Sequence, residues 1–457
     1  MGWWQEPLGA LVQGHRVIVA GGPAVFWTPM VPTLREVGAT DVLVVATDGA
    51  GVGPPPDTST VVVDRLDHGR DHMAAIRASV RAIAEPPPHV VAAVEAFDPG
   101  RRAVVFASFL NESPALVGRP VVAHRRPEWV ALEDKTTVDG LLDRAGVQRG
   151  ASVVVPIGDV EGTWRRLDLG AGTVWAADAR DGYHGGGALT RWVTDDDEAA
   201  AATADLRAHC KTVRVMPFLE GIATSVHGLV LPDGVVALRP VELITLRRGH
   251  ALRYCGCATF WDPAPALREE MRNAARSLGE QLRAEVGFRG AFTLDGVATA
   301  DGFRPTELNP RFGAGLGVIT RGLADVPLHL VLDLVVAGIT LPIAATDLER
   351  EILTLADAAR VGASWQIGTT PETPVDNRPA SYADGEWGWA SDGELPDGHV
   401  IGGDGFTRIN FDPPRTPVGF SVGPRAAAFW RFADAELGTG LGPLTAPVDV
   451  AASARHG

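Results

Sequence analysis

The first 125 residues alternate between apolar runs and polar, helix-forming stretches. Short runs rich in valine, isoleucine and phenylalanine are typical of buried strands, and the stretches between them predict helices. Strands that alternate with helices imply a parallel α/β sheet. The pattern therefore predicts an N-terminal α/β domain over residues 1–125, with strand-like runs at 16–20, 42–46, 59–63, 89–97 and 103–108.

Helices, hairpins and a glycine-rich loop follow between residues 126 and 340. Val138, Leu141 and Leu142 share one face of a predicted helix that ends near Gly146. We expect a lid lobe over about 130–215 and a second lobe over about 216–340. The predicted elements are a strand–loop–strand at 173–193, an N-capped helix at 195–210, strands at 213–221, 224–232 and 234–249, an amphipathic helix at 266–286, and a hairpin at 288–311 with its turn at Asp301-Gly302.

The last part of the chain is rich in glycine, proline and aspartate. Short strands between turns and a closing helix at 424–438 predict a third, mixed domain over residues 341–457. The expected fold class is thus multidomain, with a parallel α/β domain followed by α+β regions.

Polar side chains occupy alternate positions, 307, 309 and 311, in the first half of the segment TELNPRFGAGLG, residues 306–317. Side chains alternate between the two faces of a strand, so Glu307, Asn309 and Arg311 project to one face. A carboxylate, an amide and a guanidinium cannot pack as an apolar core. The pattern indicates a site for a metal and an anion, or else a solvated edge strand.

Composition narrows the classes of function. A chain of 457 residues predicts two to four domains. We find no run of 18 apolar residues and no basic, apolar leader at the N-terminus, so we expect a cytoplasmic protein without a membrane partner. The net charge of −15 argues against nucleic acid as a partner. Three cysteines are too few for a disulfide framework and lack metal-binding spacing.

The order of these elements resembles the ATP-grasp superfamily of carboxylate–amine ligases over about residues 15–340. The motifs are EDKTT with AGV at 133–147, the glycine loop at 182–187, a strand ending in LEG at 219–221, and DGVATADGFRPTELNPR at 295–311. The long C-terminal addition and the arginine-rich, lysine-poor composition look most like the peptide ligases of peptide-antibiotic (pheganomycin-type) biosynthesis. The resemblance implies an ATP-grasp fold.

The resemblance also implies a chemistry and its residues. ATP would phosphorylate a carboxylate, and an amine would attack the resulting acyl phosphate, with Mg²⁺ as the cofactor. Asp295, Glu307 and Asn309 match the metal-ligand positions, and Mg²⁺ prefers such oxygen ligands. Arg311 and Lys135 match the catalytic residues that contact the phosphates. A solvated hairpin face and a surface lysine are the respective alternatives.

The nucleotide pocket would lie between the two lobes. The segment 216–221 matches the strand whose backbone pairs with adenine, and Glu220 is a candidate for the ribose hydroxyls or a plain surface residue. The glycine loop would close over the phosphates and exclude water, or is an ordinary hairpin loop. The residues implied to bind nucleotide are Lys135, His184, Gly185, Gly186, Gly187, Pro217, Phe218, Leu219 and Glu220.

One departure from the family stands out. The second phosphate lysine is missing, because Ala176 or Ala177 stands at its position, and Arg180 could reach the same space. Arginines at 239, 247, 248, 253 and 289 are candidates for binding a substrate carboxylate. The expected activity is formation of a peptide bond between an amino-acid-like acid and an amino acid or peptide. A metabolic ligase with a non-peptide nucleophile and a nucleotide-binding module without turnover are the alternatives, and a homodimer is one option for assembly.

Overall fold

The N-terminal part of the computed structural model is a parallel sheet covered by helices. The structure describes residues 2–49, 51, 53–63, 72–178, 185, 187, 189–323, 325–369, 371, 373–403 and 405–450. The strands pair in the order β3-β2-β1-β4, all parallel, which confirms the predicted parallel sheet. The elements are α1 (Gln5–Val12), β1 (Arg16–Ala20), η1 (Ala24–Trp27), α2 (Met30–Glu36), β2 (Asp41–Ala46), β3 (Ser59–Val62), α3 (His72–Ala84), α4 (Pro88–Phe97) and β4 (Val104–Ala107).

One predicted strand of this part is wrong. Residues 89–97 form helix α4, although three valines there favour a strand. Pro88 occupies the first turn of the helix, where its fixed φ is compatible with helix and its missing N–H costs nothing. Val90 and Val94, four residues apart, are both buried against the sheet side. The helical spacing of these apolar residues outweighed their local preference for a strand.

A connecting segment leads into the region of the predicted lid lobe, which has its own antiparallel sheet. The lid strands pair in the order β7-β10-β8-β9. The predicted helix after Lys135 and the N-capped helix are confirmed as α6 and α8, the latter capped by the Asp195 side chain. The elements are β5 (Ala115–Leu116), β6 (Arg119–Pro120), α5 (Pro127–Val130), η2 (Ala131–Glu133), α6 (Val138–Arg144), β7 (Val153–Pro156), η3 (Ile157–Asp159), α7 (Glu161–Leu167), β8 (Thr173–Ala177), β9 (Thr190–Val193), α8 (Asp196–Arg207) and β10 (Thr212–Pro217).

The rest of the chain builds one large sheet in the order β16-β15-β11-β13-β14-β17-β21-β20-β18-β19, with β12 beside β11. The predicted single strand at 234–249 is wrong, because it divides into β12 and β13 around Pro240, which has no N–H to donate. The strands are β11 (Ile222–Leu231), β12 (Gly234–Ala237), β13 (Val241–Arg248), β14 (Ala251–Ala258), β15 (Gly290–Thr299), β16 (Gly302–Asn309), β17 (Gly362–Ile367), β18 (Val375–Ala383), β19 (Glu386–Trp389), β20 (Gly398–Gly403) and β21 (Phe406–Phe411).

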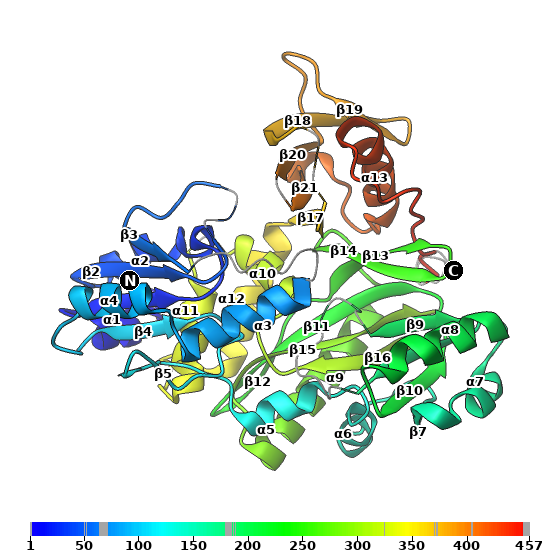
Figure 1. Ribbon diagram of the computed structural model, residues 1–457, viewed down its shortest axis with the longest axis horizontal. Coiled ribbons are helices and arrows are strands. Elements are labelled where there is room, and N and C mark those ends of the chain that lie inside the picture. Colours follow the sequence, from blue (N-terminus) through cyan, green and yellow to red (C-terminus); the bar gives the residue numbers. More distant parts are fainter. Residues whose placement is uncertain are drawn as a thin grey trace.

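This sheet runs across residue 340 without a break. Strand β17 pairs with β14, so the C-terminal strands extend the sheet of the second lobe (Figure 1). The boundary at 340 stays a prediction, and backbone hydrogen bonds join its two sides. The helices of this region are α9 (Pro265–Val286), α10 (Ala314–Arg321), α11 (Leu328–Ala337), α12 (Ala345–Ala358), η4 (Pro413–Arg415) and α13 (Gly423–Leu437), the last being the predicted closing helix.

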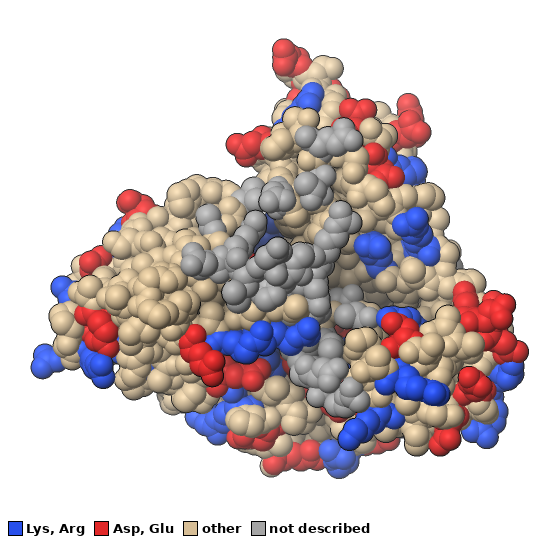
Figure 2. Space-filling model, in the orientation of Figure 1, with Lys and Arg blue, Asp and Glu red and all other residues tan. Residues whose placement is uncertain are grey.

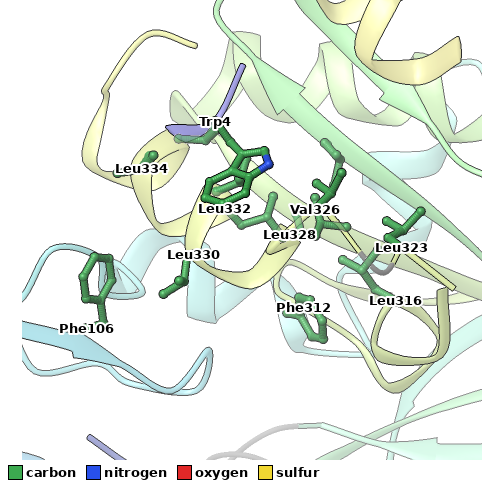
Figure 3. Close-up of a cluster of buried hydrophobic side chains, with 14 of the residues drawn as sticks. Trp4, Phe106, Phe312, Leu316, Leu323, Val326, Leu328, Leu330, Leu332 and Leu334 are labelled. Carbon is green, nitrogen blue, oxygen red and sulfur yellow. The ribbon is translucent and has the colours of Figure 1, made fainter. Parts of the chain in front are cut away.

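A shared apolar core joins the N-terminal part to the large sheet. Trp4 and Phe106 from the N-terminal part belong to the same cluster as Phe312 and the leucines of α11 (Figure 3). Burying this much apolar surface fixes the N-terminal part against the second lobe. The segment after β4 is therefore held beside the end of the β15–β16 hairpin, where the candidate site lies.

The sequence predicts neither a nucleic-acid partner nor a membrane partner, and the surface and the helices give observations on each. On the face in Figure 2, outside the grey atoms, acidic and basic side chains are interspersed rather than gathered into a basic surface. Within the described residues, every helix is too short or too polar to cross a bilayer. The three cysteines are buried, and no disulfide joins them within the described residues.

Candidate active site

The β15–β16 hairpin sets the geometry of the site. Its loop residues are Ala300 and Asp301, one position earlier than predicted, and the hairpin itself is confirmed. Asp295 pairs across the ladder with Glu307, and a register irregularity follows directly after Asp295. Cross-strand pairing brings side chains twelve positions apart in sequence onto the same part of the sheet.

A chain of hydrogen bonds connects the end of the hairpin to the segment before α6. The Asn309 amide nitrogen donates to Asp295 Oδ2 at 2.9 Å, and its oxygen accepts from Arg311 Nη2 at 2.9 Å. Arg311 Nε donates to Glu133 Oε1 at 2.7 Å, and both side chains are only 10% exposed. The amide orientation of Asn309 follows from having an acceptor on one side and a donor on the other.

Lys135 completes the polar cluster from the turn between η2 and α6. Its Nζ lies 3.0 Å from Glu307 Oε1, and the two side chains are 13% and 26% exposed. Thus the structure brings together the five residues predicted to hold metal and phosphate. Each acid in the cluster faces a donor, which keeps the site electrically compensated without a ligand.

One atom in this cluster is an exception. Asp295 Oδ1 is buried and accepts no hydrogen bond within the described part of the chain. Burial, together with the nearby carboxylate of Glu307, raises the pKa of Asp295 to about 7. A buried oxygen without a donor is costly, and a bound cation would relieve that cost.

The ligand set fits Mg²⁺ only in part. Among the described residues, no group of three or more His, Cys, Asp and Glu side chains could hold a metal. Two carboxylates and an amide oxygen are hard donors, but they leave several of the six octahedral positions open. Mg²⁺ would therefore need phosphate oxygens and waters as its remaining ligands, which suits a metal that arrives with a nucleotide.

A cavity of about 770 Å³ extends from this cluster between the lid and the large sheet. Its wall contains both the polar cluster and the apolar segment that connects the lobes. The sequence-predicted residues that line it are Lys135, Gly185, Gly187, Pro217, Phe218, Leu219, Asp295, Glu307, Asn309 and Arg311. His184 and Gly186 lie outside the described residues, as does Arg180.

The segment between the lobes forms the apolar part of the wall. Phe218 is 9% exposed, and Trp192 stacks on it with ring centroids 3.9 Å apart and an interplanar angle of 10°. The Arg247 guanidinium lies over the Phe218 ring, 5.1 Å from its centroid. An apolar wall of this kind suits a heteroaromatic base.

Glu220, the ribose candidate, is not among the residues that line the cavity. Its carboxylate is 42% exposed and pairs with Arg247 at 2.6 Å. Since Arg247 lines the cavity, Glu220 lies at the rim. The missing phosphate lysine has no substitute among the described residues of β8, where Ala176 lines the cavity.

The structure separates the candidate substrate arginines. Of the five, only Arg247 lines the large cavity. Arg239 is fully buried and pairs with Asp262 and Asp357, each at 2.7 Å, which makes it a structural residue and corrects that prediction. Arg289 lies in a second, smaller cavity.

Sequence reasoning missed two groups of residues at this site. Glu133 precedes Lys135 within the motif EDKTT, so its spacing from the lysine was a usable signal. Tyr254, Trp365 and Gln366 also line the cavity, and they come from β14 and from β17 beyond residue 340. No local pattern marks these three, because only the pairing of β14 with β17 places them there.

Comparisons with known proteins identify the fold. No family model and no curated protein matches the sequence. Biotin carboxylase from Campylobacter jejuni, solved with β,γ-ATP, has a TM-score of 0.55 at 11% identity, over 97% of this chain and 95% of that one. N5-carboxyaminoimidazole ribonucleotide synthetase with ADP has 0.53 at 12%, over 93% and 98%. L-amino acid ligase from Bacillus licheniformis has 0.51 at 16%, over 93% and 97%. The predicted ATP-grasp fold is confirmed, and at these identities the likeness shows the fold alone.

Proposed function

Starting from an ATP-grasp fold, we propose that the protein is an ATP- and Mg²⁺-dependent ligase that activates a carboxylate as an acyl phosphate and joins it to an amine. The observation that carries the proposal is the polar cluster of Lys135, Asp295, Glu307, Asn309 and Arg311 at the wall of a cavity that also has an apolar part. Phosphoryl transfer needs positioning, charge neutralisation and exclusion of water more than covalent chemistry.

Each residue of the cluster has a task in this proposal. Lys135 and Arg311 would hold phosphate oxygens, and the fork of Arg311 suits a bidentate grip. Asp295, Glu307 and Asn309 would hold Mg²⁺, which when bound offsets charge on the β- and γ-phosphates. Phe218 would contact the base. Because Lys135 pairs with Glu307 in the present arrangement, that ion pair must open for both residues to take these roles.

The finer part of the proposal concerns the substrates. The ligase would form a peptide bond between an amino-acid-like acid and an amino acid or peptide, as in the antibiotic-peptide ligases that the sequence resembles. The L-amino acid ligase among the similar folds supports this choice. A metabolic ligase with a non-peptide nucleophile is the alternative within the same fold.

One observation favours a second candidate function. Ala176 leaves the β8 side of the cavity without a cationic side chain among the described residues. A module that binds nucleotide without turnover would tolerate that loss. The presence of Asp295, Glu307 and Asn309 together favours the enzyme, since binding of a nucleotide alone does not require these oxygen ligands.

One assay distinguishes the ligase from the nucleotide-binding module. It measures the release of phosphate and ADP in the presence of ATP, Mg²⁺ and pairs of substrates drawn from a panel of amino acids and dipeptides. The enzyme predicts release that depends on both substrates and a loss of at least 100-fold in Glu307→Gln. Asp301→Asn, in the exposed loop of the same hairpin, is the matched control and should keep normal turnover. Tight nucleotide binding without cleavage in any pair would support the binding module instead.

A further inference from the structure

A second cavity, of about 60 Å³, lies between the N-terminal part and helix α11. It shares Phe109 and Arg311 with the large cavity, and Phe312 and Leu332 beside it belong to the apolar cluster in Figure 3. One water needs about 10–15 Å³ of such space, so the cavity has room for roughly four to six non-hydrogen atoms. A small molecule would fit, and a nucleotide would not.

Several residues in its wall have buried polar atoms that make no hydrogen bond within the described part of the chain. Arg125 Nε, Arg289 Nε, His329 Nε2 and Asp333 Oδ2 are all buried without a hydrogen bond in the described part of the chain. The residues Arg125, His329 and Asp333 are 6%, 4% and 7% exposed. Native structures seldom leave buried polar atoms unsatisfied, so four around one small cavity point to a ligand or ordered water.

The charges in the wall are separated from one another. Helix α11 presents His329, Leu332, Asp333 and Val336 to the cavity, which is the spacing of one helical face. Arg125 comes from the segment after β6, and Arg289 directly precedes β15. Among the described residues, no ion pair joins Asp333 to either guanidinium. Arg289 Nη1 instead lies against Gly338, where an added Cβ would be 2.5 Å away.

A carboxyl group and two guanidinium groups around one cavity, held apart, match a ligand that carries both kinds of charge. A carboxylate on the ligand would accept from Arg289 and from Arg125 Nε, since the two outer nitrogens of Arg125 face Glu112 and Glu133. An ammonium on the ligand would donate to Asp333. Burial raises the pKa of Asp333 well above its ordinary value, and an ammonium beside the carboxyl group would lower that pKa again.

We propose that this cavity is a binding site for a small α-amino acid, with its carboxylate on Arg125 and Arg289 and its ammonium on Asp333. Glycine has five and alanine six non-hydrogen atoms, which agrees with the space. The ligand would lie behind Arg311, outside the nucleotide cavity. The same chemistry serves a co-substrate or an effector, and binding itself does not rest on the proposed ligase activity.

The first test is calorimetric titration of the full chain, without nucleotide, with glycine and L-alanine. Acetate and methylammonium carry one charge each, and L-tryptophan is too large. We expect glycine or alanine to bind at least tenfold more tightly than any of these three. Equal affinity for acetate would show a plain anion site and overturn the proposal, as would no binding of either amino acid.

Two variants test the contacts. Asp333→Asn and Arg289→Met should each weaken glycine binding at least tenfold while ADP binding stays unchanged. Arg304→Met is the matched control, since Arg304 is 14% exposed in its side chain and lines neither cavity. Unchanged glycine affinity in either test variant would overturn the assignment.

A third measurement needs no variant. A crystal of the wild-type chain soaked in glycine should show the amino acid between Asp333 and Arg289, whereas water alone in that density would overturn the proposal. Labelled glycine is then added to a reaction that contains Mg²⁺ATP and substrates. Label in the product shows that glycine is a co-substrate, whereas an unlabelled product with a changed turnover rate shows that glycine is an effector. Glycine binding without ATP cleavage would leave this site standing and refute only the ligase.

Discussion

The ion pair between Glu133 and Arg311 gives the sharpest prediction. Glu133 Oε1 accepts from Arg311 Nε at 2.7 Å and lies 2.9 Å from Arg125 Nη2, so one carboxylate compensates two nearly buried guanidinium groups. Glu133→Gln removes the charge and keeps the shape. Breaking a buried pair costs about 3–5 kcal/mol, and the remaining amide oxygen restores about 1 kcal/mol as a neutral acceptor. We therefore expect a loss of about 2–4 kcal/mol in the free energy of unfolding.

The assay is urea unfolding followed by tryptophan fluorescence. The free energy of unfolding falls by about 3 kcal/mol per molar urea for the cooperative unit that contains β16. The urea concentration at the midpoint of unfolding should therefore fall by roughly 1 M. Glu285→Gln is the matched control. It removes the same charge from a carboxylate that pairs with Arg144 at the surface, at 2.5 Å, where the side chains are 30% and 56% exposed. Its midpoint should hardly change. Equal shifts of the urea midpoint in the two variants would refute the argument that burial gives the Glu133 ion pair its stabilising effect.

Three further predictions follow from other parts of the chain. Lys135→Met should raise the dissociation constant of Mg²⁺ADP at least tenfold in calorimetry, because it removes a phosphate contact; an unchanged constant would refute that role. Burial raises the pKa of Glu242 from 4.5 to about 7, so its contribution to stability is full below pH 4.5 and is lost as pH rises through about 7. Glu242→Gln should flatten that part of a melting-temperature profile, and an unaltered profile would contradict the assignment. Gly256 has φ +119°, and a Cβ there would overlap the carbonyl oxygen of Ala363. Gly256→Ala should therefore loosen β14 from β17 by more than about 2 kcal/mol, seen as faster amide exchange in the C-terminal strands but not in β1; equal exchange would refute this.

Local patterns were sufficient for most elements of the fold. Alternating polarity predicted that Glu307, Asn309 and Arg311 share a face. Strand β16 carries Glu307 and Asn309 but ends at Asn309, so Arg311 lies beyond it. The valine-rich segment 89–97 was wrongly predicted as a strand. β-branched residues favour a strand only where a neighbouring strand can pair with it, and here the buried residues lie four positions apart and pack a helix onto the sheet. Pro240 divided a predicted strand because it cannot donate to a ladder, which local hydrophobicity does not register.

What the sequence by itself determined was the hairpin and its polar residues Asp295, Glu307 and Asn309, since these depend on one short segment and on alternation along its strands. Only the tertiary structure decided what surrounds the cluster. Glu133 meets Arg311 across 178 positions, Trp365 reaches the cavity through the pairing of β17 with β14, and Arg289 and Asp333 line the same second cavity. These contacts arise from the packing of separate elements around shared cores, and the energy that selects them is nonlocal, so no stretch of sequence read alone contains them.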